Sequence, residues 1–335
     1  MDQEQIDHLQ RIQRCCEALQ SLPWSLGMDI DQIMATLIDF DSSHWTFVKY
    51  LSLPLYEELE ALLTRSQAGA VLQQRPAITV VLPVHRASDN LLAKALASTR
   101  MQVGVEIECR VSIDGREQDH ALVKDLLAQM PPIPERWSAW VHFSPVNRGV
   151  GMCRNQALRC ISTPYFTCID ADDVFHPLRC LHALLLMADR GLQRLNTGYS
   201  RVSFRQGKAI LINGSLAWTG HNSFVAQSQL LERYGYLADL RCHEDTEYMR
   251  RLEFFGVPMF NSAAVGHYMN SEPDWSYISL ATPARREVHP IEGHPYLCGT
   301  VIAALTDESR NVETHYSQLY QDVISHGLSR AFPPE

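Results

Sequence analysis

Apolar runs alternate with segments of helical spacing between residues 78 and 173, and this alternation constrains the fold more than any other feature of the sequence. Ile78–Val84, Ile107–Ile113 and Tyr165–Ile169 have the apolar character of buried parallel strands. Between them we expect three helices and one more strand: Asp89–Met101, Ala121–Met130, Val150–Ile161 and the strand Ala139–Phe143. The pattern predicts the α/β class, with a doubly wound, mostly parallel sheet flanked by helices.

Three carboxylates, Asp170, Asp172 and Asp173, directly follow the last of these strands. Carboxylates packed this closely repel one another and raise one another's pKa, and a hard divalent ion with oxygen ligands removes the conflict. The Asp-x-Asp spacing therefore predicts a Mn²⁺ or Mg²⁺ site formed by Asp170 and Asp172. The alternative is a helix cap before Pro177, which would use one aspartate but not three.

Several strand ends are expected to meet at one pocket, because ligands of such sheets bind beyond the carboxyl ends of the strands. Val84, Asp114 and the three aspartates would collect there. The segment Asn147–Asn155 follows a strand and opens a helix, where backbone N–H groups and the helix dipole favour phosphate. The alternative for this segment is a tight glycine turn with solvated arginines.

A second acidic group, Glu244, Asp245 and Glu247, lies at the start of a predicted helix. The helix dipole alone would favour acids at this position. Next to a pocket that holds a metal and a diphosphate, however, one of these carboxylates can remove the proton of an acceptor.

Four further residues are candidates for the site, and each of them can instead have a purely structural role. His267 can complete a metal shell through an imidazole nitrogen, or it can be structural. Trp218, His221 and Asn222 precede the acidic helix and can form the wall of a sugar and acceptor pocket, or they can pack in the core or in a loop.

The charge, the cysteines and the apolar content of the chain limit its possible partners and its location. A net charge of −9 argues against a surface that binds nucleic acid through phosphate charge. The nine cysteines form no Cys-x-x-Cys pair, which favours a reducing cytoplasm over a disulfide framework. The polar amino terminus lacks the features of a secretory signal, and no stretch approaches the roughly 20 apolar residues of a transmembrane helix. We therefore expect a cytoplasmic protein, with peripheral membrane association left open.

The chain is expected to have three parts. Residues 1–70 read as a helical amino-terminal extension, residues 77–270 as the catalytic domain, and residues 271–335 as a helical carboxyl-terminal tail that packs on it. The amino-terminal helices can bind a partner, form a homo-oligomer or cover an acceptor groove.

Five segments taken in order resemble the family-2 glycosyltransferases of the GT-A fold, and the resemblance covers about residues 77–270. These segments are Val80–Arg86, Ser112–Gly115, Asn147–Gly149 with Arg154–Asn155, Ile169–Asp173 and Glu244–Asp245. The resemblance implies an inverting, metal-dependent transfer from a nucleotide-sugar, with a UDP-sugar favoured. It also implies a hexosyltransferase-type enzyme that acts on a glycan, a lipid-linked glycan, a protein or a small molecule.

The resemblance also assigns roles to individual residues. Residues expected to bind the nucleotide-sugar are Pro83, Val84, Arg86, Asp114, Asn147, Arg148, Arg154, Asp170 and Asp172. Among these, Asp114 would contact the base and Asp172 would be the more direct metal ligand. The Glu244–Asp245 pair would supply the general base, with Asp245 favoured.

This chain departs from the family pattern at two places. It has Ile113-Asp114-Gly115-Arg116 where many members have Asp-Asp-Gly-Ser, and it lacks the Gln-x-x-Arg-Trp stretch of processive synthases. A transferase that adds a single sugar is the preferred interpretation. Two others remain open: a sugar-1-phosphate nucleotidyltransferase, and a non-catalytic nucleotide-sugar-binding or scaffold protein of the same fold.

Overall fold

A computed structural model describes the chain at residues 10, 14, 30–38, 42–74, 76–204, 208–209, 216–238 and 244–271. Within these residues nine strands form one sheet, in the order β3-β2-β1-β4-β8-β6-β9-β5 with β7 paired to β6. The strands are β1 Ala77–Val84, β2 Glu106–Asp114, β3 Trp137–Ser144, β4 Tyr165–Cys168, β5 Val174–Phe175, β6 Arg194–Ser203, β7 Lys208–Ala209, β8 Trp218–Gln227 and β9 Phe260–Asn270.

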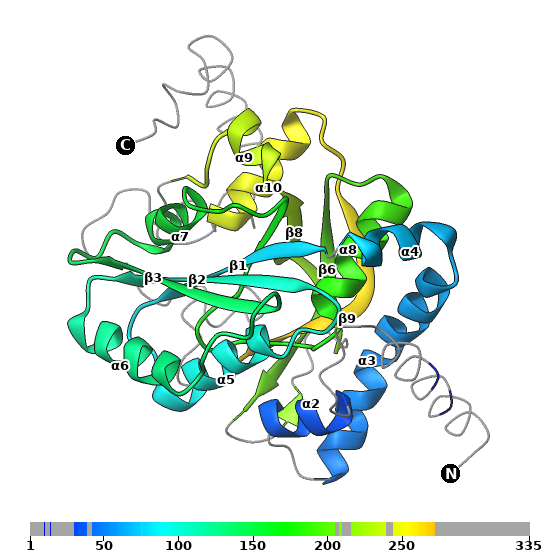
Figure 1. The fold of residues 1–335 in the computed structure, drawn as a ribbon, viewed down its shortest axis with the longest axis horizontal. Coiled ribbons are helices and arrows are strands. Elements are labelled where there is room, and N and C mark those ends of the chain that lie inside the picture. The colour runs from blue at the N-terminus through cyan, green and yellow to red at the C-terminus, as the bar shows by residue number, and fades with distance from the viewer. Residues whose placement is uncertain are drawn as a thin grey trace, which may run out of the picture.

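Helices cover both faces of this sheet (Figure 1). They are α2 Ile30–Ile38, α3 Ser42–Leu63, α4 Ser66–Gln73, α5 Asp89–Arg100, α6 Glu117–Ala128, α7 Val150–Leu158, α8 Arg179–Arg190, α9 Gln229–Tyr234 and α10 Glu244–Phe254. None of these helices is long and apolar enough to cross a membrane. The expected tail beyond residue 271 lies outside the described residues, as does nearly all of the chain before residue 30.

The pairing of the strands confirms the expected α/β architecture. β1 pairs in parallel with β2 and β4, and β2 pairs in parallel with β3, so the predicted parallel group is present. Antiparallel strands extend it, because β8 joins β4 to β6 in antiparallel pairing on both sides. The later strand β9 then runs parallel to β6.

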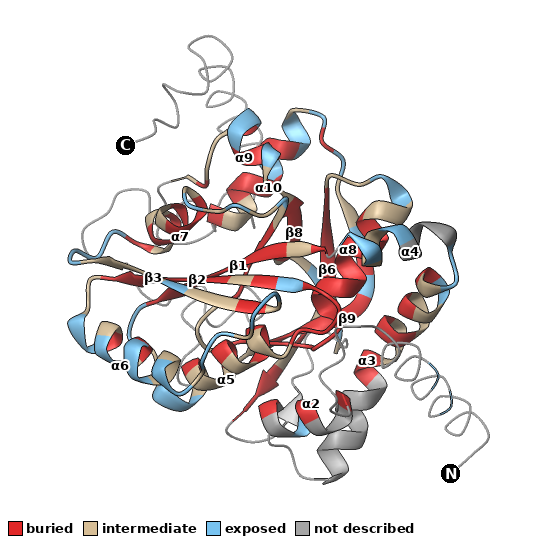
Figure 2. Ribbon diagram, in the orientation of Figure 1, coloured by how far each residue is buried: buried red, intermediate tan, exposed pale blue. Residues whose placement is uncertain are grey.

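Two apolar clusters, one on each face, hold the sheet between its helices. Val80 belongs to the larger cluster and Val81 to the smaller one, as expected for neighbouring residues of a strand that is buried on both faces. Figure 1 shows α5 and α6 on one side and α7, α9 and α10 on the other. Buried residues fill the central strands and the inward helix faces (Figure 2), whereas β3 at the end of the sheet is mostly half-buried. Burial from both sides explains why the parallel strands read as continuous apolar runs.

The helices before β1 share the larger cluster with the sheet. Ile33 of α2 and Leu55 and Leu59 of α3 are all buried in it. A polar contact adds to this packing, because Glu58 Oε2 accepts a hydrogen bond from Ser262 Oγ of β9 at 2.9 Å and lies 2.8 Å from His182 Nε2 of α8. The described helices α2 and α3 therefore pack on the same core as the sheet.

Replacement of Leu59 by alanine tests this shared core. Leu59 has no exposed surface, and removal of a fully buried leucine side chain costs about 2–5 kcal/mol through lost transfer free energy and a residual cavity. We expect the free energy of unfolding by urea to fall by that amount in a single transition. Ala61→Ser, at an exposed position of the same helix, is the control and should change stability by about 0.5 kcal/mol. A stable sheet with only α3 melted would contradict the shared core.

Candidate functional site

The carboxyl ends of β1, β2, β3 and β4 lie at one edge of the sheet, as the parallel pairing requires. This edge carries Val84, Asp114 and Ser144, and the chain leaves β4 there through Ile169 to the aspartates. Ile169 N donates to Val81 O at 3.0 Å, so the acidic loop begins beside the end of β1. The structure thus brings the predicted strand-end residues to a common edge.

Arg154 of α7 joins the two acidic groups of the sequence. Its Nη2 donates to Asp170 Oδ1 at 2.6 Å, and its Nη1 pairs with Glu244 Oε1 at the start of α10. The arginine is 5% exposed. Burial alone would lower the pKa of Arg154, but the carboxylates of Glu244 and Asp170 outweigh it and raise this pKa well above its usual value. Arg154 therefore stays charged between acids that are distant in sequence.

Glu244 is the buried member of the acidic pair on α10. Burial raises the pKa of Glu244 to about 7, because desolvation of the carboxylate outweighs the attraction of Arg154, and the charge of Asp245 acts in the same direction. The ion pair with Arg154 fixes its side chain inside the protein.

Asp245 has a different environment from Glu244. It is half-buried, and its Oδ1 accepts hydrogen bonds from Thr246 N at 2.6 Å and from Thr246 Oγ1 at 3.3 Å. Hydrogen bonds within the described residues leave its Oδ2 unused. Burial lowers the pKa of His221, and the charge of Asp245 opposes this shift. Within the part of the chain that the structure describes, the two sides of the Asp245 carboxylate thus differ, because only Oδ1 accepts hydrogen bonds.

The acidic loop divides its three carboxylates between different partners. Asp173 accepts hydrogen bonds from Asn270 N and lies against His267 Nε2, both at 2.9 Å. Asp172 is half-buried, and no lysine or arginine in the described part of the chain forms an ion pair with it. Burial, together with the charges of Asp173 and Asp170, raises the pKa of Asp172 well above its usual value. Among the described residues, Asp172 thus has no cationic side chain paired with it to offset this repulsion.

The carboxylates of Asp170 and Asp172 are oxygen donors of the kind that a divalent cation prefers. No three His, Cys, Asp or Glu side chains among the described residues form a complete metal site, so ligands beyond Asp170 and Asp172 would have to come from a phosphate or from water. His267 is buried, and its Nε2 faces Asp173. A metal role for His267 would need its other ring nitrogen. Metal binding by these residues stays a prediction.

Asp114 binds the turn that opens α7. Its Oδ1 accepts from Arg148 N at 2.7 Å and its Oδ2 from Gly149 N at 2.8 Å. The backbone of Gly149 has φ 90°, a conformation that favours glycine. Asn147 and Arg148 themselves are exposed at the rim of the site. A tight glycine turn, which was the alternative for this segment, is therefore present, and a buried carboxylate holds it. Of the two arginines of the segment, Arg148 is exposed and Arg154 is buried.

Pro83 and Val84 end β1 inside the protein, and the loop that follows carries Arg86 on the surface. Arg86 has φ 56°, and its backbone N–H donates to Asp119 Oδ2 at 2.7 Å. Asp119 is buried in the first turn of α6 and was not among the predicted site residues. Its place as an acid near a helix start was the only signal in the sequence, and that signal also fits ordinary helix capping.

The predicted sugar and acceptor wall lies on β8. Trp218, His221 and Asn222 are half-buried there, and Asn222 Nδ2 donates to Met269 Sδ of β9 at 3.0 Å. Tyr199 of β6 pairs opposite Trp218, which the sequence alone did not suggest. In the residues that the structure describes, no hydrogen bond or ion pair connects Trp218 or Asn222 to the acidic residues.

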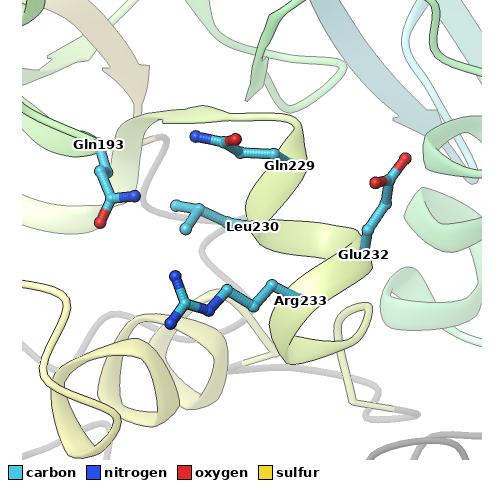
Figure 3. A pocket seen from close by; sticks show the side chains of 5 residues that line it. All are labelled: Gln193, Gln229, Leu230, Glu232 and Arg233. Atoms are coloured by element: carbon cyan, nitrogen blue, oxygen red, sulfur yellow. The ribbon is translucent and has the colours of Figure 1, made fainter.

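A hollow of about 370 Å³ lies away from this site, lined by Gln193, Gln229, Leu230, Glu232 and Arg233 (Figure 3). Gln193 O accepts from Gln227 N, and Gln227 pairs with Tyr165 at the amino end of β4. The acidic loop follows the other end of this strand. The hollow therefore lies at the opposite end of β4 from the acidic loop and does not belong to the acidic site.

Comparison with known proteins gives one family and several distant structures. Residues 79–217 match the sequence model of glycosyl transferase family 2. A search of curated proteins found no match. Among solved structures, TarS 1-349 of S. aureus in complex with UDP has 18% identity and a TM-score of 0.47, and the alignment covers 59% of this chain and 61% of that one.

Two further structures have comparable scores. TarS 1-349 in complex with UDP-GlcNAc has 17% identity and a TM-score of 0.47, with 58% of this chain and 59% of that chain covered. The mannosyltransferase PcManGT of Pyrobaculum calidifontis, in complex with GDP-Man and Mn2+, has 16% identity and a TM-score of 0.44, with 72% and 68% covered. This chain thus spans about three fifths of the TarS 1-349 chains.

Proposed function

We propose that this chain, whose residues 79–217 match the sequence model of glycosyl transferase family 2, transfers a sugar from a nucleotide-diphosphate sugar to an acceptor hydroxyl with inversion. The preferred donor is a UDP-sugar, as the motif resemblance implies. The acceptor class is a glycan, a lipid-linked glycan, a protein or a small molecule. We expect dependence on Mn²⁺ or Mg²⁺.

The observation that carries this proposal is the bridge made by Arg154. Asp170 belongs to the loop that would receive the donor, and Glu244 precedes the proposed base by one residue. One buried guanidinium contacts both of them at the carboxyl edge of the sheet. A glycosyl transfer reaction needs a donor site and a base side by side, and the two ion pairs of Arg154 support this proposal.

On the donor side, the nucleoside would lie against Pro83, Val84 and Arg86, with Asn147 and Arg148 at the rim. Asp170 and Asp172 would hold the divalent cation. When bound, this cation supplies positive charge to the departing diphosphate. Arg154 keeps the side chain of Asp170 in place through the 2.6 Å hydrogen bond.

On the acceptor side, Oδ2 of Asp245 would accept the proton of the attacking hydroxyl. The acceptor oxygen forms a bond to the anomeric carbon from one face while the bond to the diphosphate oxygen breaks on the other, so the anomeric configuration inverts. Glu244 is tied to Arg154 and is the poorer candidate for the base. His221 and Trp218 would form part of the acceptor wall.

A thermal-shift experiment tests donor and metal binding together. We expect a UDP-sugar to raise the melting temperature only weakly without Mn²⁺ and strongly with it, since ligand at 100 times its Kd adds about 2.7 kcal/mol of stability. Asp172→Ala should lose the Mn²⁺-dependent part, whereas Asp125→Asn on the exposed face of α6 should behave as wild type. An unchanged Mn²⁺ response in Asp172→Ala would remove this residue from the metal site.

Assays of the products released by the wild-type protein distinguish the proposed function from the two other interpretations. A nucleotidyltransferase would consume a nucleoside triphosphate with a sugar 1-phosphate and release diphosphate. A binding or scaffold protein would bind the nucleotide-sugar without releasing UDP from it in the presence of Mn²⁺. Slow release of UDP through hydrolysis or transfer supports the proposed function.

A further inference from the structure

The carboxylate of Asp114 is already used by the protein. The residue is 4% exposed at the end of β2. Its two oxygens accept the N–H groups of Arg148 and Gly149 at 2.7 and 2.8 Å. These bonds are charge-assisted, which makes them stronger than bonds between neutral groups. A ligand that used this carboxylate would have to reach a buried group whose oxygens are both engaged.

The turns that Asp114 connects are packed too closely for another arrangement. A Cβ atom at Gly115 would lie 2.5 Å from Asn147 N, so the backbones of the two turns are in direct contact. Gly115 N donates to Ser144 O at 2.9 Å. Buried backbone N–H groups need an acceptor, and Asp114 is the acceptor for two of them. It also supplies the negative charge that favours the start of α7.

The rim of the proposed donor pocket depends on the same residue. His85 Nδ1 lies 2.7 Å from the backbone oxygen of Asp114, and Asn147 Nδ2 lies 3.2 Å from His85 Nε2. Asn147 Oδ1 in turn accepts from Gly149 N at 3.2 Å. Loss of the Asp114 carboxylate would therefore loosen Arg148 and Gly149 directly and, through the contacts of Asn147, disturb Asn147 and His85.

We infer that Asp114 is a positioning residue that fixes the rim of the donor pocket, and that it does not read the nucleotide base. The inference rests on the proposed function, because it concerns the donor of that reaction. It differs from what the motif resemblance implies, in which Asp114 contacts the base. Discrimination between bases would then come from the exposed side chains that Asp114 holds in place.

Binding of UDP, GDP and dTDP with Mn²⁺ to the full-length chain tests the inference. Asp114→Asn replaces one of the two acceptor oxygens by an amide N–H group. This donor would face the backbone N–H of Arg148 or Gly149, and because two donors cannot bond to each other the turn before α7 should loosen. We expect all three dissociation constants to rise by the same factor, about tenfold for one lost charge-assisted bond. Asp125→Asn should leave them unchanged. A rise for one nucleotide with little change for the others would overturn the inference.

A second variant covers the case in which Asp114→Asn does not fold. Asp114→Ser retains one short acceptor for the start of α7 and removes the charge, and it should again weaken the three nucleotides equally. Failure of wild-type protein to bind any of them would contradict the proposed function. Normal wild-type binding combined with an altered preference in either variant would contradict only the inference about Asp114.

Discussion

Asp245→Asn is expected to reduce glycosyl transfer by about 10²–10⁴-fold, the usual contribution of a general base. The asparagine carbonyl can still accept from Thr246 N, the bond that Asp245 Oδ1 makes at 2.6 Å, so the start of α10 should be preserved. What is lost is the oxygen that would take the acceptor proton. Donor binding, measured as the Mn²⁺-dependent thermal shift, should stay near the wild-type value.

Two controls make this result specific. Glu253→Gln removes an exposed acid from the same helix, where it pairs with Arg250 at 3.2 Å, and it should keep wild-type transfer. Glu244→Gln removes the buried acid and should lower stability, because Arg154 then loses a charged partner. Full transfer by Asp245→Asn would remove Asp245 from the mechanism and make Glu244 the residue to examine as the base.

The parallel half of the fold was predictable from sequence because each of its central strands is marked by an apolar run within a short stretch of residues. The predicted strand Ile78–Val84 corresponds to β1 Ala77–Val84, and Ile107–Ile113 to β2 Glu106–Asp114. Strands buried on both faces have continuous apolar runs that stand out from their surroundings. The acids after β4 were equally visible, since their placement follows from the end of a strand.

The antiparallel half was harder to predict. Strand β9, Phe260–Asn270, contains small and polar residues whose pattern resembles neither a clear alternation nor an apolar run. It is buried because β6 and β5 pair with its two edges. Such burial is decided by tertiary contacts, and a window of sequence does not contain them.

The contacts within the site were also beyond sequence analysis. Arg154 and Glu244 are 90 residues apart and meet only when α7 and α10 pack on the same face of the sheet. The motif resemblance gave no sign that the carboxylate of Asp114 would accept hydrogen bonds from the backbone N–H groups of Arg148 and Gly149. Sequence motifs identify which residues gather at the site, and the local backbone determines what each side chain touches.

Arg154→Met is expected to destabilise the protein by about 3–5 kcal/mol, the range for removal of one partner of a buried ion pair. Glu244 would stay buried without its cation, and Asp170 would lose its 2.6 Å hydrogen bond. Arg154→Lys should have an intermediate effect, because a single ammonium group cannot match two carboxylates as a guanidinium does. Arg250→Met removes an exposed ion pair on α10 and should cost less than about 1 kcal/mol.

The pH dependence of this destabilisation provides an independent check. Burial raises the pKa of Glu244 to about 7 in the wild type, and loss of Arg154 should raise it further. Above about pH 7 the folded variant then binds more protons than the folded wild type, so the stability difference should grow as pH rises and shrink toward about pH 5. Urea unfolding at both ends of this range measures the change. A difference independent of pH would mean that Glu244 is not the source of the instability.

The double variant Arg154→Met with Glu244→Gln separates folding from positioning. Removal of both charges leaves no uncompensated ion in the interior, so most of the stability lost in Arg154→Met should return. Transfer should nevertheless stay low, because Asp170 still lacks the guanidinium that connects the donor loop to α7. If transfer recovered together with stability, Arg154 would serve only to neutralise Glu244, and the bridge between the donor loop and the base helix would have no role in the reaction.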